Sequence, residues 1–162
     1  MFRAFRRRPL RLPAADERPC ILLATEGRPI PKVAVAEAAE LALAAHARVH
    51  VLAIARIHGV GFGLPAPGLF PNKQEWQERR DTVAAAIEAL KRRGLEADGH
   101  VFGTRKATKR IVGEAERLGC QAIVMAGDRP RNRFIGDFSW SQEPYRVQRR
   151  AKIPVHVVVG GD

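Results

Sequence analysis

Five short segments rich in apolar residues constrain the fold of this chain more than any other feature of its sequence. Four of them are mainly apolar and predict strands: residues 20–24 (CILLA), 48–57 (RVHVLAIARI), 121–126 (QAIVMA) and 153–159 (IPVHVVV). The runs at 20–24 and 121–126 have the pattern of strands buried on both faces. The fifth segment, residues 95–102 (LEADGHVF), alternates polar and apolar side chains and predicts a less buried strand near a sheet edge.

Helical patterns separate the predicted strands along the chain. Residues 32–45 are rich in Ala and Leu, and Pro31 suits the first turn of a helix there. Asn72 and Glu75 have the spacing of a capping box, which predicts a second helix that ends at Gly94.

Two further helices complete the pattern. Thr104 is expected to cap a third helix that ends at Gly119, and residues 141–151 are expected to form the last one. Residues 58–71 carry four glycines and three prolines, which predicts a long loop. Strands and helices therefore alternate along the chain, and this predicts an α/β fold: a doubly wound, five-stranded parallel sheet with helices on both faces.

Composition and motifs exclude several classes of protein. The chain has 162 residues, 46% of them hydrophobic, which predicts one domain with its own core over residues 19–162. Cys20 and Cys120 are too few and too far apart for a disulfide framework or a CxxC metal site, and we expect buried thiols in a cytoplasmic protein. His46 and His50 are four residues apart, but a predicted helix-to-strand boundary separates them, so no metal site is predicted. The GxSxG, HExxH and Walker signatures are missing, which favours binding over catalysis.

Positive charge is concentrated at the start of the chain. The whole sequence has 28 Lys and Arg against 17 Asp and Glu, a net charge of +11. Residues 1–18 predict a basic, disordered arm that holds Arg3, Arg6, Arg7, Arg8 and Arg11. Phe2 and Phe5 lie among these arginines, so contact with a nucleic acid or an anionic membrane surface is the alternative to a merely solvated arm.

The predicted fold also indicates where a ligand would bind. In a doubly wound sheet the ligand crevice opens beyond the carboxyl ends of the strands, where the winding reverses, so the loops at 25–28 and 127–141 are the candidates. The first loop offers the hydroxyl of Thr25 and the carboxylate of Glu26. The second offers Arg129, Arg131 and Arg133. A carboxylate for ribose or base and guanidinium groups for phosphate would make a nucleotide site, and arginines that only solvate the loop are the alternative.

Four segments together resemble the universal stress protein family: residues 21–27 (ILLATEG), 48–57, 122–127 (AIVMAG) and 149–159 (RRAKIPVHVVV). The resemblance covers most of the chain from Cys20 onward. It implies the strand order 3-2-1-4-5 and a non-catalytic stress-response protein that binds ATP or another adenine nucleotide between the loops after strands 1 and 4. The candidate nucleotide-binding residues are Ala24, Thr25, Glu26, Ile54, Met125, Gly127, Arg129, Arg131, Gly136 and Ser141.

The phosphate loop of this chain departs from the family pattern. Glu26 stands where ATP-binding members place an acidic residue near the adenosine, and a backbone contact to adenine would fall at Ile54. Counted from Gly127, however, Pro130 and Trp140 stand where two of the family's glycines would be. Counted from Ala126, Arg129 and Ser139 stand there instead, so the glycines are lost in either register. A proline removes an amide donor and a tryptophan occupies volume. The expected ligand is therefore a smaller or differently posed nucleotide. The alternative is a nucleotide-free protein-interaction module in which Pro130 and Trp140 fill the phosphate site.

The last predicted strand suggests a partner. It is apolar, lacks a charged residue that would discourage pairing with another chain, and is expected at a sheet edge. The family resemblance implies a homodimer through that strand, paired antiparallel across a two-fold axis. Val155, Val157 and Val159 are the expected interface residues. An edge covered by a loop or by the basic arm is the alternative.

Overall fold

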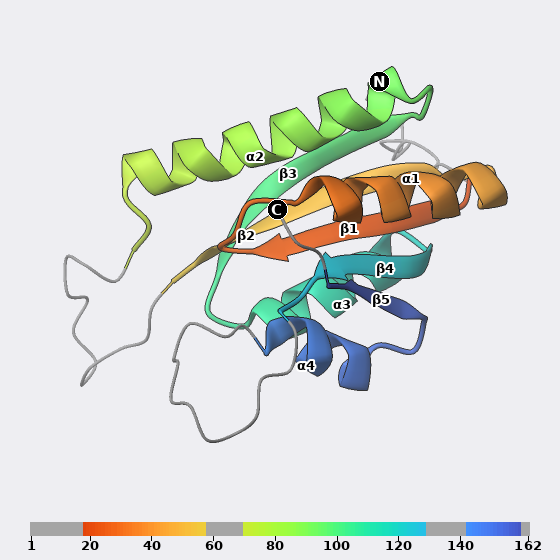
Figure 1. Cartoon of the computed structure of the whole chain (residues 1–162). Coiled ribbons are helices and arrows are strands. Elements are labelled where there is room, and N and C mark those ends of the chain that lie inside the picture. Colours follow the sequence, from red (N-terminus) through yellow and green to blue (C-terminus); the bar gives the residue numbers. More distant parts are fainter. Residues whose placement is uncertain (1–17, 58–69, 129–141, 160–162) are drawn as a thin grey trace, which may run out of the picture.

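The described residues form a five-stranded parallel sheet and four helices (Figure 1). The computed structural model describes residues 18–57, 70–128 and 142–159. The strand order is β3-β2-β1-β4-β5, as the family resemblance implied. The strands are β1 (Cys20–Glu26), β2 (Arg48–Arg56), β3 (Ala97–Thr104), β4 (Cys120–Ala126) and β5 (Val155–Val158), and the helices are α1 (Lys32–Ala45), α2 (Lys73–Arg92), α3 (Ala107–Arg117) and α4 (Glu143–Arg150).

Helices cover both faces of the sheet, which makes two apolar cores (Figure 1). α1 and α2 pack on one face, where Ile21 and Leu23 of β1 lie. α3 and α4 pack on the other face, where Leu22 and Ala24 lie. Because neighbouring residues of a strand point to opposite faces, both sides of β1 are buried, and this explains its continuous apolar sequence.

α1 lies close to the sheet because the side chains that it turns inward are small. Its buried residues are Ala34, Val35, Ala38, Ala39 and Ala42. Pro31 occupies the N-cap position in an extended conformation, one residue before the first helical turn that the sequence predicted for it. Its carbonyl oxygen accepts hydrogen bonds from the amides of Ala34 and Val35.

The capping box predicted for α2 is confirmed. The Asn72 side chain accepts a hydrogen bond from the Glu75 amide at 2.8 Å, and the Glu75 carboxylate accepts one from the Asn72 amide at 2.9 Å. The helix then buries Val83, Ala86 and Leu90 against the sheet. These two hydrogen bonds satisfy amides that would otherwise have no partner at the start of the helix.

Some predicted boundaries were wrong. Thr104 is the last residue of β3 and does not cap α3; its hydroxyl accepts a hydrogen bond from the Lys106 amide at 3.0 Å, and Lys106 is the N-cap. β5 begins at Val155, so the last strand is shorter than predicted. α4 begins at Glu143 and not at residue 141 as predicted, and Ser141 lies outside the described residues. A polar residue such as Thr104 can end a strand or cap the helix that follows, so its sequence context leaves the boundary open by one or two residues.

β3 and β5 are the two edge strands. β3 is only half buried, as its alternating sequence predicted. It also approaches β2 closely at Gly99, where an added Cβ would lie 2.3 Å from the carbonyl oxygen of Val51. Residues 1–17 of the predicted basic arm (1–18) and residues 58–69 of the predicted loop (58–71) lie outside the described residues. Within the described part of the chain, every helix is too short or too polar to cross a membrane.

Candidate functional site

A cavity lies where the strand order reverses. β1 pairs with β2 on one side and with β4 on the other, so the loops that leave β1 and β4 diverge at the carboxyl end of the sheet. Between these loops is a cavity of about 360 Å³. Residues from both loops line it, among them Thr25, Glu26, Arg28, Met125, Gly127 and Asp128. The volume falls within the range of small-molecule sites.

The structure brings four of the predicted site residues to this cavity: Thr25, Glu26, Met125 and Gly127. Ala24 is buried in the core below it, next to Met125 across the β1–β4 ladder. Ile54 is also buried, and its carbonyl oxygen accepts a hydrogen bond from the Gly27 amide at 3.2 Å. The other predicted site residues lie outside the described residues: Arg129, Arg131, Gly136 and Ser141, together with Pro130, Arg133 and Trp140.

A tight turn holds the first loop. The hydroxyl of Thr25, which is buried, donates a hydrogen bond to the carbonyl oxygen of Arg28 at 2.9 Å. Gly27 lies between them with a φ of +63°, a conformation that side-chain-bearing residues rarely adopt. The turn fixes the positions of Glu26 and Arg28, which both line the cavity.

Glu26 belongs to an ionic cluster with buried Glu143 and the more exposed Arg56. The Arg56 Nε atom lies 2.7 Å from Glu26 Oε1, and the Glu26 side chain is 7% exposed. Burial is the largest cause that raises the pKa of Glu26, to about 7, and the negative charge of Glu143 adds to it, whereas Arg56 acts in the opposite direction. Glu143 in turn accepts a hydrogen bond from the Thr108 hydroxyl. Near neutral pH, both the protonated and the ionised forms of Glu26 are therefore populated, and the carboxyl group can donate or accept a hydrogen bond to a ligand.

Arg28 and Asp128 join the two loops across the cavity. Arg28 donates to Asp128 Oδ2 at 2.7 Å, and the Asp128 carbonyl oxygen accepts a hydrogen bond from the Tyr145 hydroxyl at 3.1 Å. Both residues lie in the loops that the sequence indicated, 25–28 and 127–141, but neither was among the predicted binding residues. Their pairing depends on the β1–β4 register, which no local pattern reveals.

Gly127 is required by the packing of the sheet. A Cβ at this position would lie 2.6 Å from Val157 Cγ1, so only glycine fits against β5. The Gly127 amide donates to the Val158 carbonyl oxygen at 2.9 Å. This amide is therefore already hydrogen-bonded within the sheet, and phosphate contacts would have to come from other groups.

A larger groove, of about 700 Å³, lies between α1 and α2. It is lined by small side chains of α2 such as Ala85 and Ala89, together with the charged residues Asp81 and Arg92. The smaller cavity is the better candidate because it lies at the reversal of the sheet and gathers polar groups from two loops.

The two cysteines are neighbours at the opposite end of the sheet. Cys20 and Cys120 are the first residues of β1 and β4, are register partners, and are both free and buried. A hydrogen bond with Cys20, followed by burial, raises the pKa of the Cys120 thiol. The expectation of buried thiols is met.

The universal stress protein family model matches residues 19–159. That match spans nearly all of the sheet and helices described above. The chain belongs to the universal stress protein family. No match was found among curated proteins.

Solved structures of universal stress proteins share the fold. A protein of this family from Burkholderia pseudomallei is 23% identical, with a TM-score of 0.63 over 87% of this chain and 96% of that one. One from Archaeoglobus fulgidus, in complex with dAMP, is 20% identical, with a TM-score of 0.62 over 86% and 96%. A third, in complex with cAMP, is 17% identical, with a TM-score of 0.60 over 88% and 97%. At these identities the likeness shows the common fold.

Proposed function

We propose that this universal stress protein is a non-catalytic, homodimeric binding protein that takes an adenine nucleotide between the loops after β1 and β4. The observation that supports this most directly is the cavity of about 360 Å³ at the reversal of the sheet. Two of the similar solved structures are complexes with an adenine nucleotide, dAMP in one and cAMP in the other.

The chemistry of the cavity suits a nucleoside monophosphate. Glu26 offers a carboxyl group that can either donate or accept a hydrogen bond near pH 7, which suits ribose hydroxyls or an adenine edge. Arg28 offers a guanidinium group to a phosphate, a pairing that is short and strong. The Gly127 amide is held by Val158, and the glycines of the family's phosphate loop are missing whether the pattern is counted from Gly127 or from Ala126. For both reasons AMP or cAMP is favoured over ATP.

Calorimetric titration of nucleotide-free protein with AMP, cAMP, ADP and ATP tests the proposal. We expect saturable binding of the monophosphates in the micromolar range and weaker binding of ATP. Arg28→Gln should weaken AMP binding by about 10- to 100-fold, the loss expected for one hydrogen bond to a charged group. Arg80→Gln is the matched control, because Arg80 lies exposed on α2 and contacts Gln77.

Two results would contradict the proposal. One is the lack of saturable binding of all four nucleotides up to millimolar concentration, which would favour the alternative, a protein-interaction module. The other is equal AMP affinity in Arg28→Gln and in the wild type, which would place the phosphate away from this cavity.

The homodimer is proposed to form through β5. This strand lies at the edge of the sheet, and Val159, just beyond it, is 42% exposed. An apolar sheet edge can pair with a second copy through backbone hydrogen bonds. Val155 and Val157 are half buried in the single chain and would be covered further. Val159→Asp should convert the dimer to a monomer in light scattering, whereas Leu43→Asp, at an exposed site on α1, should not. A dimeric Val159→Asp variant would contradict this interface.

A further inference from the structure

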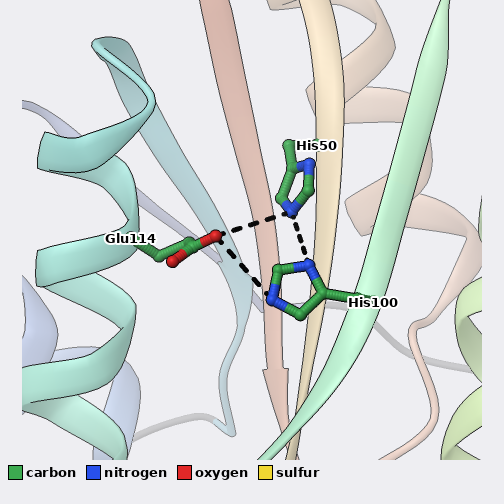
Figure 2. Close-up of side chains that lie close together, drawn as sticks. All are labelled: His50, His100 and Glu114. Carbon is green, nitrogen blue, oxygen red and sulfur yellow. Dashed lines mark hydrogen bonds and ion pairs between the residues drawn. The ribbon is translucent and has the colours of Figure 1, made fainter. Parts of the chain in front are cut away.

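Three side chains with metal-binding atoms converge on one face of the sheet, under α3 (Figure 2). They are His50 of β2, His100 of β3 and Glu114 of α3. His50 Nε2 lies 3.1 Å from His100 Nδ1 and 3.9 Å from Glu114 Oε1, and His100 Nε2 lies 3.7 Å from the same oxygen. Spacing along the sequence gave no sign of this cluster, because the three residues come from three different elements.

The register of the sheet explains why the two imidazoles meet. His50 pairs with Asp98, and Leu52 pairs with His100, so the two histidines lie diagonally opposite on neighbouring strands. Such diagonal neighbours are within reach of large side chains. α3 covers this face and presents Glu114, whose side chain is 1% exposed, whereas His100 is 37% exposed. The cluster is thus closed toward the core and open beside His100.

A second carboxylate orients His50. Its Nδ1 atom lies 2.7 Å from Asp98 Oδ1. A carboxylate only accepts hydrogen bonds, so Nδ1 is the donor and Nε2 of the neutral ring carries a lone pair. That lone pair faces His100 and Glu114. Metal-binding histidines in proteins usually have this arrangement, with one nitrogen on the metal and the other bonded to a carboxylate.

Glu114 is fixed by two arginines. Arg117 donates to Oε1 at 2.5 Å and to Oε2 at 3.2 Å, and Arg110 NH2 lies 3.3 Å from Oε2. Arg48 lies 3.7 Å from Asp98 on the other side of the cluster. Three guanidinium groups thus face two carboxylates. This excess of positive charge limits the affinity for a cation, and Arg117 competes with the cation directly for Oε1.

We propose that His50, His100 and Glu114 form a binding site for a divalent transition-metal ion of the zinc type. Two imidazole nitrogens and one carboxylate oxygen are a donor set that zinc accepts, and three protein ligands leave a fourth position for water. Metal–ligand bonds of about 2.0–2.1 Å in a tetrahedron place the donor atoms roughly 3.3 Å apart. With one ligand atom taken from each residue, the three atoms lie within 4.8 Å of one another in the structure. The two short contacts of His100 use different ring nitrogens, Nδ1 toward His50 and Nε2 toward Glu114, and only one of them can bind the ion. The side chains would therefore have to close around the metal, which rotation of the half-exposed His100 ring would allow.

The proposed metal site is separate from the nucleotide cavity. His50 precedes Ile54, at the level of Glu26, by four residues of β2, which corresponds to roughly 13 Å along an extended strand. Metal binding and nucleotide binding can therefore be tested independently.

Zinc titration of the full chain, followed by competition with a chromophoric chelator, tests the site directly. We expect one zinc ion per chain, with a dissociation constant on the order of 10 micromolar, because three ligands work against nearby positive charge. His100→Ala should weaken binding by more than about 100-fold, since it removes a ligand rather than a supporting group. His156→Ala is the matched control, because His156 is a half-exposed histidine that pairs with Glu37 far from the cluster. Circular dichroism confirms that each variant is folded.

A second variant tests the competition at Oε1. Arg117→Met should bind zinc about tenfold more tightly, because it frees this oxygen and removes a neighbouring positive charge while Arg110 still orients the carboxylate. Replacing zinc by cobalt shows whether the thiols of Cys20 and Cys120 bind the ion instead of the two histidines and Glu114. A thiolate ligand on Co²⁺ adds a strong near-ultraviolet band that a site of two histidines and one glutamate lacks. No saturable zinc binding by the wild type, equal affinity in His100→Ala, an unchanged affinity in Arg117→Met, or a thiolate band would each overturn the assignment.

Discussion

Replacing Glu26 by glutamine should make the protein more stable at alkaline pH and remove much of its pH dependence. The Glu26 side chain is 7% exposed and faces Glu143, so its ionised form is disfavoured in the folded chain. Its pKa is raised from an ordinary 4.5 to about 7. Between these values the folded chain holds a proton that the unfolded chain has released, so the free energy of unfolding falls as pH rises.

The size of the effect follows from that interval. Protonated Glu26 makes its full contribution to stability below pH 4.5, and this contribution is lost as pH rises through about 7. The difference between the two pKa values corresponds to about 3 kcal/mol. Glutamine resembles the protonated carboxyl group in shape and carries no charge. Glu26→Gln should therefore match the wild type near pH 4.5 and exceed it by about 2–3 kcal/mol at pH 8.

Urea unfolding followed by circular dichroism from pH 4.5 to pH 8 measures this difference. Glu88→Gln is the control, because Glu88 is an exposed residue of α2 that pairs with Arg92 and should leave the pH profile unchanged. Parallel pH profiles for Glu26→Gln and the wild type would refute the reasoning. So would a variant that is less stable than the wild type at pH 8.

Further stability predictions follow from local geometry. Asn72→Ala should lower the free energy of unfolding by about 1 kcal/mol, because it removes one half of the capping box; an unchanged urea midpoint would show that the box contributes nothing. Gly99→Ala should destabilise by more than about 2 kcal/mol, since its Cβ would lie 2.3 Å from a backbone oxygen of β2. Gly113→Ala should instead stabilise by about 0.5–1 kcal/mol, because Gly113 lies inside α3 with open space around a Cβ. Equal melting temperatures for the two alanine variants would contradict this comparison.

Much of the fold was predictable because its signals are local. The run at 20–24 is apolar at every position because β1 lies at the centre of the sheet with a core on each side. Asn72 and Glu75 indicate a helix start through hydrogen bonds between residues three apart. The strand order came from the family resemblance, since no local pattern specifies which strands pair.

The candidate site was predictable only in part. Thr25, Glu26 and Gly127 were found because ligands bind at the carboxyl ends of strands where winding reverses. Arg28 and Asp128 were missed because their ion pair joins residues one hundred positions apart. The histidine and glutamate cluster was missed for the same reason. It becomes visible only when the β2–β3 register brings His50 and His100 together.

Native mass spectrometry of the purified protein with added AMP tests the central claim most directly, because one spectrum reports both oligomeric state and bound ligand. The account predicts a dimer that gains the mass of one AMP per chain, with a smaller gain for Arg28→Gln at the same concentration. A protein that gains no mass with AMP, cAMP, ADP or ATP would contradict the claim that the cavity between the β1 and β4 loops binds an adenine nucleotide.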